Sequence, residues 1–287
     1  MKWLFSLLLM TSLAHAETSS LIPAFLEAVD IYESPAKNHL YVRPEVLAAV
    51  KVLKEKNIRP ESLNRFKNLK SQVWKLREDD KYDAWIRENK NLKTNLDVPE
   101  ISLHATRIDV VNATEYGGDS VYAYFFITDG VIPTGKVSSI YENVSSGEGF
   151  FFNATDRAVF PLIGITAKAP SNHLIVDYGV IESDGDDIKE MQEISSIIID
   201  MAIAVYSAQN PAAGAVLVNL RKEIKAMADL LIKQNSDDRL ITDSFGYTSQ
   251  EIAELMSDKS YLDITKNHAK ETTFSSWEYN VHFRLLR

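Results

Sequence analysis

Two short acidic clusters are the residues in this sequence best suited to chemistry. The stretch Glu182 to Asp187 reads Glu-Ser-Asp-Gly-Asp-Asp and places four carboxylates within six residues. A second cluster, Asn235 to Asp238, ends in two adjacent aspartates. Carboxylates this close repel one another, so the folded protein must pair them, hydrate them or bind a cation between them. Because calcium takes oxygen ligands from flexible acidic loops more readily than Mg²⁺ does, the sequence predicts a calcium site.

The calcium ligands are expected to come from three loops. The candidate ligands are Glu115, Asp119, Glu182, Asp184, Asp186, Asp187, Asp237 and Asp238. An EF-hand register that starts at Glu182 would add Glu190 and Glu193, but Asp187 occupies the position that requires glycine and a strand precedes the loop. A strand-loop-helix site is therefore the closer analogy. The alternative is a solvated acidic turn in which Asp187 caps the following helix.

Most of the elements that would position these loops are predicted to be strands. Runs rich in β-branched and aromatic residues, separated by turn residues, begin at Ile101. The predicted strands cover residues 101–110, 121–127, 137–144, 149–152, 158–167, 174–181 and 273–285. In the last of them Trp277, Tyr279, Val281, Phe283 and Leu285 alternate with polar residues. Six or seven antiparallel strands with one face buried indicate a β-sandwich.

A helical hairpin is predicted to interrupt the strands at about residues 187–234. Apolar residues recur there at helical spacing, and Asn210-Pro211 is typical of a helix start. The apolar content of residues 194–220 also raises the hypothesis of membrane contact. Each arm is shorter than the roughly 20 residues that span a bilayer, and Asp200 lies in the first arm. Burial against the sandwich is therefore the preferred interpretation.

The N-terminal third is predicted to contain a signal peptide and short helices instead of strands. Residues 1–16 combine Lys2, an apolar run and Ala14-His15-Ala16, a pattern typical of a secretory signal peptide. Residues 17–96 indicate short helices, with proline at the start of two of them. This segment holds 15 Lys and Arg against 12 Asp and Glu, whereas residues 97–287 hold 15 against 28. We expect the helical region to pack on the sandwich, and the sandwich to fold without it.

Composition narrows the classes of function. The chain has 287 residues, 45% hydrophobic residues and a net charge of −9, as expected for a globular protein with a sizeable core. It contains no cysteine, which excludes thiol catalysis and thiolate metal sites. The acidic C-terminal region disfavours nucleic acid as a partner. The predicted class is α+β: an antiparallel β-sandwich at residues 97–287 with an inserted helical hairpin, preceded by a short all-helical region.

Catalytic patterns in the sequence are weak. Gly118-Asp119-Ser120-Val121 is similar to the serine block of some esterases, but Asp263 and His268 do not have the spacing of that family's acid-histidine block. Glu182 and Asp238 could form a carboxylate pair for glycoside hydrolysis. His104 and His282 lie on predicted strands and could approach each other. We expect no enzyme, and a hydrolase remains the less favoured alternative.

The acidic segments resemble a known type of module. Glu115 to Tyr122, Glu182 to Ile188 and Asp237 to Asp243 resemble the top loops of synaptotagmin-type calcium-and-lipid-binding β-sandwiches. They are more similar to bacterial secreted sandwich modules with a helical insert between strands. The resemblance covers about residues 99–287, although the five-aspartate pattern of the calcium sensors is incomplete and no basic lipid-binding groove is evident. It implies a calcium-binding sandwich.

Taken together, these features predict a secreted or periplasmic, non-catalytic calcium-binding β-sandwich protein. Its work would be adhesion, envelope association or partner binding, with a protein or a cell-envelope surface as the partner. The alternative is a membrane-active protein whose hairpin, at about residues 194–220, inserts into a bilayer. The sequence does not indicate an oligomeric state.

Overall fold

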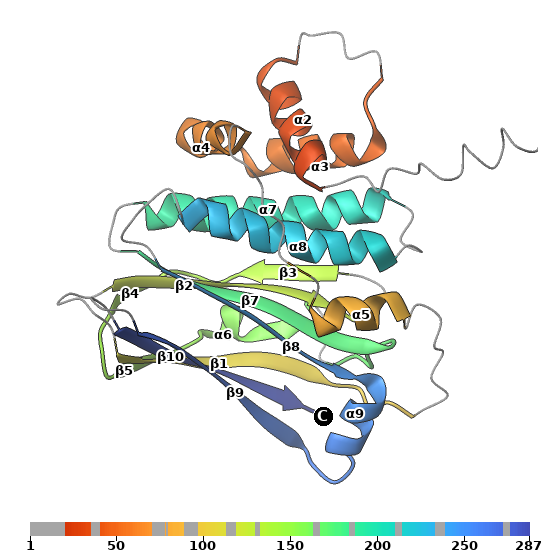
Figure 1. Ribbon diagram of the computed structural model, residues 1–287, viewed down its shortest axis with the longest axis vertical. Coiled ribbons are helices and arrows are strands. Elements are labelled where there is room, and N and C mark those ends of the chain that lie inside the picture. Colours follow the sequence, from red (N-terminus) through yellow and green to blue (C-terminus); the bar gives the residue numbers. More distant parts are fainter. Residues whose placement is uncertain are drawn as a thin grey trace, which may run out of the picture.

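The computed structural model describes residues 21–35, 41–70, 78, 80–88, 97–112, 119–129, 133–162, 167–183, 187–209, 214–232, 239–271 and 276–287. Within these ranges the chain is an α+β protein in which two antiparallel sheets pack face to face and helices stack on one side (Figure 1). The predicted fold class is confirmed. The predicted signal peptide lies outside the described residues.

The two sheets differ in what covers them. The covered sheet has the strand order β3-β2-β7-β8, with β4 beside β2, and the outer sheet has the order β5-β1-β10-β9, with β6 beside β1. The covered sheet consists of β2 (Asp119–Thr128), β3 (Pro133–Val137), β4 (Tyr141–Val144), β7 (His173–Ser183) and β8 (Arg239–Thr248). The outer sheet consists of β1 (Ser102–Asn112), β5 (Glu148–Phe151), β6 (Ala158–Phe160), β9 (Tyr261–Glu271) and β10 (Ser276–Leu286).

The helical hairpin lies on the covered sheet. Its arms are α7 (Ile188–Ala208) and α8 (Gly214–Ile232), close to the predicted insertion. Strand β2 is consequently buried on both faces: Tyr122 and Phe126 belong to the helix-facing core, and Phe125 belongs to the core between the sheets. This double burial explains why residues 121–127 form an unbroken apolar run, because a strand with no solvent face has no reason to alternate.

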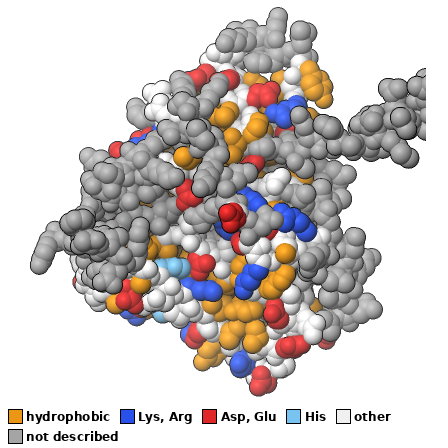
Figure 2. Space-filling model, viewed as in Figure 1, with side chains coloured by type: hydrophobic (Ala, Val, Ile, Leu, Met, Phe, Trp, Pro, Cys, Tyr) orange, Lys and Arg blue, Asp and Glu red, His pale blue; other side chains and the backbone are white. Residues whose placement is uncertain are grey.

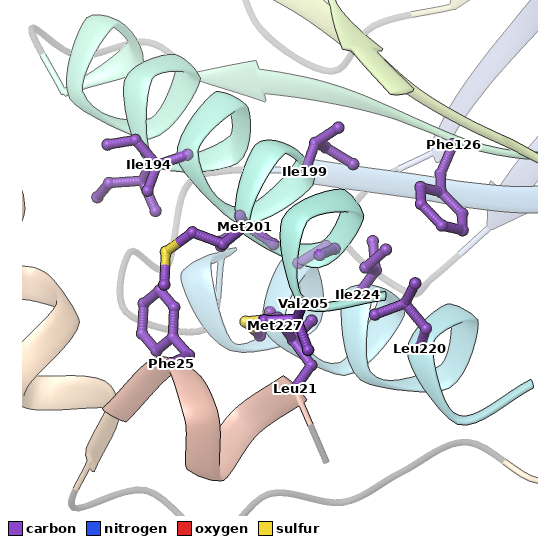
Figure 3. Close-up of a cluster of buried hydrophobic side chains, with 14 of the residues drawn as sticks. Leu21, Phe25, Phe126, Ile194, Ile199, Met201, Val205, Leu220, Ile224 and Met227 are labelled. Atoms are coloured by element: carbon purple, nitrogen blue, oxygen red, sulfur yellow. The ribbon is translucent and has the colours of Figure 1, made fainter. Parts of the chain in front are cut away.

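The N-terminal helices form a further layer above the hairpin (Figure 1). They are α2 (Leu21–Glu33), α3 (Pro44–Lys56) and α4 (Pro60–Lys70), and α5 (Lys81–Glu88) lies lower, beside α8. Figure 3 shows Phe25 of α2 beside Met201 of α7, and both belong to one buried cluster that reaches from α2 to the covered sheet. The N-terminal region therefore shares its core with the hairpin. This finding argues against our expectation that the sandwich folds without it.

Ion pairs join the basic N-terminal helices to the acidic α7. Lys56 pairs with Asp200 at 2.5 Å, and Arg59 pairs with Glu193 at the same distance. The charge asymmetry of the sequence indicated such attraction, but the acidic partner surface is the hairpin and not the sheets. These pairs are partly exposed, so each contributes little to stability on its own.

Several strand predictions needed correction. The predicted strand at residues 137–144 is two short strands, β3 and β4, and the strand at residues 158–167 is described only as β6, which ends before Pro161. Strands β8 and β9 were missed because their polar residues mask the alternation. The remaining short helices are α6 (Ala154–Arg157) and α9 (Ser249–Leu255), and α9 begins with a capping box between Thr248 and Glu251.

Candidate functional site

Glu182, one of the predicted calcium ligands, is buried inside the sandwich. It lies near the end of β7 and accepts a hydrogen bond of 2.5 Å from the hydroxyl of Tyr279 on β10. The contact joins the two sheets across the core. Glu182 therefore has a structural partner that the sequence did not reveal.

Asp187 and the two glutamates that follow it in the EF-hand register face basic side chains. Arg65 of α4 pairs with Asp187 at 3.0 Å and with Glu190 at 3.1 Å. Glu193 accepts hydrogen bonds from Arg59 and from the hydroxyl of Ser62. Asp187 stands at the N-cap position of α7, but its side chain makes no capping hydrogen bond, so the predicted cap is wrong in that detail.

Most of the remaining predicted calcium ligands lie outside the residues that the structure describes. Glu115, Asp184, Asp186, Asp237 and Asp238 lie outside the described residues, and only the backbone of Asp119 is described. Within the described part of the chain, no three acidic or histidine side chains are grouped as a metal site. The calcium site stays a prediction that depends on the loops outside the described ranges.

The catalytic patterns of the sequence do not assemble among the described residues. Asp263 forms a two-point ion pair with Arg284, whereas His268 lies 2.7 Å from the hydroxyl of Tyr178. Burial lowers the pKa of His268, and Asp243 opposes this shift. His104 is paired in register with Arg284 and not with His282.

A solvent-facing cleft of about 460 Å³ lies on the outer sheet and is the strongest candidate site. We call it the outer-face cleft. Its lining residues are Thr106, Arg107, Asp109, Phe151, Arg157, Asp263, Thr265, His282, Phe283 and Arg284. They come from β1, β5, α6, β9 and β10, so segments about 180 residues apart in the sequence meet here.

Strand register aligns these side chains in rows across the outer sheet. In one row Phe151, Arg107, His282 and Thr265 are successive cross-strand neighbours from β5 to β9. Cross-strand neighbours in antiparallel pairs stand on the same face within contact distance. The residues that flank His282 along β10, Val281 and Phe283, point inward and belong to the buried core between the sheets. The polar row therefore stands on strands that are anchored by core packing.

Both sides of the outer-face cleft carry the same three-part arrangement. On one side the guanidinium of Arg107 lies 5.0 Å from the ring of Phe151 and pairs with Asp109. On the other side the guanidinium of Arg284 lies 4.8 Å from the ring of Tyr261 and pairs with Asp263 at 2.6 Å. A planar cation held between a ring and a carboxylate is fixed in orientation. The remaining N–H groups can donate to a ligand.

A relay of hydrogen bonds crosses the floor of the outer-face cleft. Nε2 of His282 lies 2.9 Å from a carboxylate oxygen of Asp109, and Nδ1 of His282 lies 3.0 Å from the hydroxyl of Thr265. The acid-histidine-hydroxyl order is that of nucleophilic hydrolases. However, the same Asp109 carboxylate also pairs with Arg107, which weakens it as a partner for a protonated His282.

Gly149 keeps the Arg107–Asp109 pair in place. It is the cross-strand neighbour of Asp109 on β5, and a β-carbon at this position would come within 2.3 Å of the Asp109 carboxylate and 2.8 Å of Arg107. A larger residue would displace the pair. Gly149 therefore leaves room for the pair in its present position, and no special backbone conformation is involved.

Arg157 supplies the unbalanced charge of the cleft. Three arginines and two aspartates line it, and no carboxylate partner of Arg157 occurs among the described residues. Burial lowers the pKa of the neighbouring His104, and the positive charge of Arg157 lowers it further. The local excess of positive charge in the cleft comes from Arg157.

A second polar region is built around Arg221 of α8, which is only 1% exposed. Its guanidinium contacts Asp177 at 2.6 Å, Asp83 at 2.5 Å and Asp80 at 3.1 Å. Lys225, one turn further along α8, pairs with Asp177 and with Asp80. We call these five residues the buried ionic cluster. It ties α5, α8 and the covered sheet together.

Opposing effects set the pKa values in the buried ionic cluster. Burial by itself would raise the pKa of Asp177, but the charge and hydrogen bonds of Arg221, with help from Lys225, outweigh it and lower the pKa to about 2. Burial raises the pKa of Asp83, and Arg221 offsets only part of this. Burial also tends to raise the pKa of Asp80, but the positive charges of Arg221 and Lys225 outweigh this effect, so the pKa of Asp80 is lowered.

A lateral cleft of about 420 Å³ opens above the buried ionic cluster. It is lined by Glu78, Asp80, Lys81, Tyr82, Asp83, Lys222, Lys225, Thr242, Asp243, Ser244 and Lys266. Figure 2 shows Lys and Arg side chains lying among Asp and Glu side chains near the middle of the face in view. Four lysines and four carboxylates balance each other, so this cleft has no net preference for an anion or a cation.

Sequence reasoning missed both polar regions. No functional role was predicted from the sequence for Asp80 or Asp83, although Asp80 caps α5 by accepting hydrogen bonds from the backbone of Tyr82 and Asp83. An Asp-x-x-Asp spacing before a helix is a usable capping signal. No comparable signal marks the outer-face cleft, because its residues meet only through strand register.

Comparisons with protein-family models, with curated proteins and with solved structures return no match for this chain. The resemblance to calcium-binding sandwich modules therefore stays a prediction.

Proposed function

We propose that this is an exported, non-catalytic binding protein whose ligand occupies the outer-face cleft. The observation that carries the proposal is the asymmetry of the sandwich. The long helices stack on the covered sheet (Figure 1). The far face of the outer sheet presents aligned polar side chains around an open cleft. Polar groups that converge in a concave site on a rigid scaffold favour specific binding.

The side chains of the cleft are oriented before any ligand arrives. Arg284 is fixed by two contacts with Asp263 at 2.6 and 3.0 Å and by the ring of Tyr261. A preorganised site loses less entropy on binding than a flexible one. The proposed export rests on the sequence pattern at residues 1–16 and places the ligand in the periplasm, at the cell surface or in the medium.

Retention on cells tests this proposal. Labelled mature protein is incubated with intact cells of the producing organism, and the pelleted fraction is measured. We expect the double variant Arg107→Ala, Arg284→Ala to lose retention, and Lys51→Ala, which changes an exposed pair on α3, to keep it. Equal retention of the outer-face variant and the wild type would show that the cleft is not the binding surface.

The hydrogen-bond relay favours hydrolysis as a second candidate function. Thr265 would be the nucleophile, His282 the base and Asp109 the residue that orients it. The Arg107–Asp109 pair and the ordinary strand setting of Thr265 make this the weaker hypothesis. A hydrolase activity that disappears in Thr265→Val while cell retention persists would establish it, and activity unchanged in that variant would exclude Thr265 as the nucleophile.

The membrane-active alternative concerns α7. The sequence predicted arms too short to span a bilayer, but α7 has 21 residues and by length and composition could cross a membrane. However, 56% of its most apolar window is buried, as in a core helix of a soluble protein. Its apolar face contacts both the covered sheet and the N-terminal helices, so the packed state leaves it no lipid-facing stripe. Flotation of the mature protein with liposomes, independent of calcium, would support this alternative; sedimentation without lipid would count against it.

A further inference from the structure

The lining of the outer-face cleft restricts the chemical class of its ligand. Two of the five large hydrophobic side chains that are exposed among the described residues flank it: Phe151 is 62% exposed and Tyr261 is 51% exposed. An arginine lies over each ring, and more than half of each residue is exposed to solvent. An exposed ring on a sheet surface offers a flat apolar plane on which a ligand ring can stack.

The spacing of the two rings indicates an extended ligand. Phe151 is on β5 and Tyr261 is on β9, with β1 and β10 between them. Three strand spacings of about 4.8 Å separate the rings by roughly 14 Å across the sheet, before the offset along the strands is added. A ligand that contacts both rings must contain several linked units.

Both donors and acceptors line the cleft between the two rings. Thr265 and His282 provide groups that can donate or accept, Asp109 and Asp263 provide acceptors, and the arginines provide donors. Hydroxyl groups donate and accept, so a ligand rich in hydroxyls can satisfy a mixed lining of this kind. A lipid chain or an apolar peptide could not.

The charge of the lining adds a requirement for negative groups. Arg157 has no carboxylate partner among the described residues, and Arg107 and Arg284 each keep N–H donors beyond those bonded to their aspartates. Guanidinium groups bind carboxylate and sulfate oxygens through paired hydrogen bonds. The whole chain has a net charge of −9, so general attraction to a polyanion is excluded and binding must be local.

We infer that the outer-face cleft binds a linear glycan that carries acidic groups, with sugar rings stacked on Phe151 and Tyr261 and the acidic groups on Arg157, Arg107 and Arg284. The inference rests on the proposed function, because it names the ligand class for the same site. Carboxylates of a uronic acid and sulfate esters share the chemistry that these arginines recognise.

Calorimetric titration of the mature protein tests the inference. The probes are an oligogalacturonate, dextran sulfate and uncharged dextran of matched length. We expect the oligogalacturonate, the sulfated glycan or both to bind, and uncharged dextran to bind at least tenfold more weakly. Binding to either acidic probe supports the inference, and the stronger one identifies the acidic group; equal affinity for uncharged dextran overturns the role of charge.

Matched variants separate stacking from charge. We expect the double variant Phe151→Ala, Tyr261→Ala and the single variant Arg157→Gln each to weaken binding at least tenfold. Tyr41→Ala is the control, since Tyr41 is 82% exposed but lies near α3. Thermal unfolding checks that each variant is folded. Binding that survives the loss of both rings would overturn the stacked arrangement.

Calorimetry with the acidic probes and the cell-retention assay test the ligand class and the binding surface separately. If neither acidic probe binds but the Arg107→Ala, Arg284→Ala variant still loses cell retention, the ligand class is wrong and the binding surface stands. If neither probe binds and that variant is retained like the wild type, both are wrong.

Discussion

Replacing Arg221 with methionine should destabilise the protein more than almost any other single change. The guanidinium is buried and contacts three carboxylates, of which Asp177 and Asp83 are each 2% exposed. Methionine fills much of the volume but supplies no charge. Asp177 would keep Lys225 at 2.8 Å as its only described cation, and Asp83 would lose its ion pair.

The expected loss follows from the cost of an uncompensated buried charge. Removing one partner of a buried ion pair destabilises proteins by about 3–5 kcal/mol. The lowering of the Asp177 pKa from 3.8 to about 2 corresponds to about 2 kcal/mol for that carboxylate alone, which agrees in size. At roughly 2–4 °C per kcal/mol, the melting temperature should fall by about 10 °C.

The loss should depend on pH with a definite sign. In the wild type the pKa of Asp177 is below its unfolded value, so its contribution is complete above about pH 4 and disappears as the pH falls towards 2. Without Arg221, burial raises the pKa of Asp177 and the carboxyl can take up a proton. The variant should therefore be closest to the wild type in mild acid and furthest from it at neutral pH.

Urea unfolding followed by circular dichroism at pH 7 and at pH 5 measures both effects. The exposed pair of Lys51 and Glu55 provides the control, because Lys51→Met should cost at most about 0.5 kcal/mol. The double variant Arg221→Met, Asp177→Leu should lose less than the sum of its single changes, since no unpaired charge remains at Asp177. A loss under 1 kcal/mol in Arg221→Met, or a loss that grows at pH 5, would refute the reasoning.

Three further predictions concern other parts of the chain. If the acidic loops bind calcium, calcium at a hundredfold above Kd should stabilise the protein by about 2.7 kcal/mol in thermal unfolding, and Asp184→Asn with Asp186→Asn should abolish the shift; no shift in the wild type would leave the loops as solvated turns. His173 is buried, neither ring nitrogen has a hydrogen-bond partner within the described chain, and burial lowers its pKa to about 4. Its folded pKa is below the unfolded value, so stability should fall by about 3 kcal/mol between pH 6.5 and 4, and the His173→Phe variant should lose most of that slope; an unchanged slope in urea titrations would contradict this. Deletion of residues 17–96 should yield an insoluble protein, because it uncovers α7 and removes two carboxylates from Arg221; a soluble product with β-type circular dichroism would show that the sandwich folds alone.

The spacing of residues along single segments of the sequence predicted many of the helices and strands. Proline at the first helical position predicted the starts of α3 and α4 within the helical N-terminal region. Period-two alternation predicted β10, whose inward residues Val281, Phe283 and Leu285 are buried. These signals are local, because each depends only on which side of one element meets the core.

Local pattern failed where a strand has weak alternation. Strand β9 is an edge strand of the outer sheet, and its solvent-facing residues include Asp263, Thr265 and Asn267. Such strands carry few apolar residues, so no periodic signal separates them from a loop. Two of these polar residues, Asp263 and Thr265, line the outer-face cleft.

The sequence by itself determined the class of the protein, the inserted hairpin and the presence of acidic loops. Only the tertiary structure decided which charges meet. Arg221 is 44 residues from Asp177 and 138 from Asp83, and His282 is 173 residues from Asp109. Pairing over such separations depends on strand register and helix packing, which are properties of the whole fold, and no local spacing encodes them.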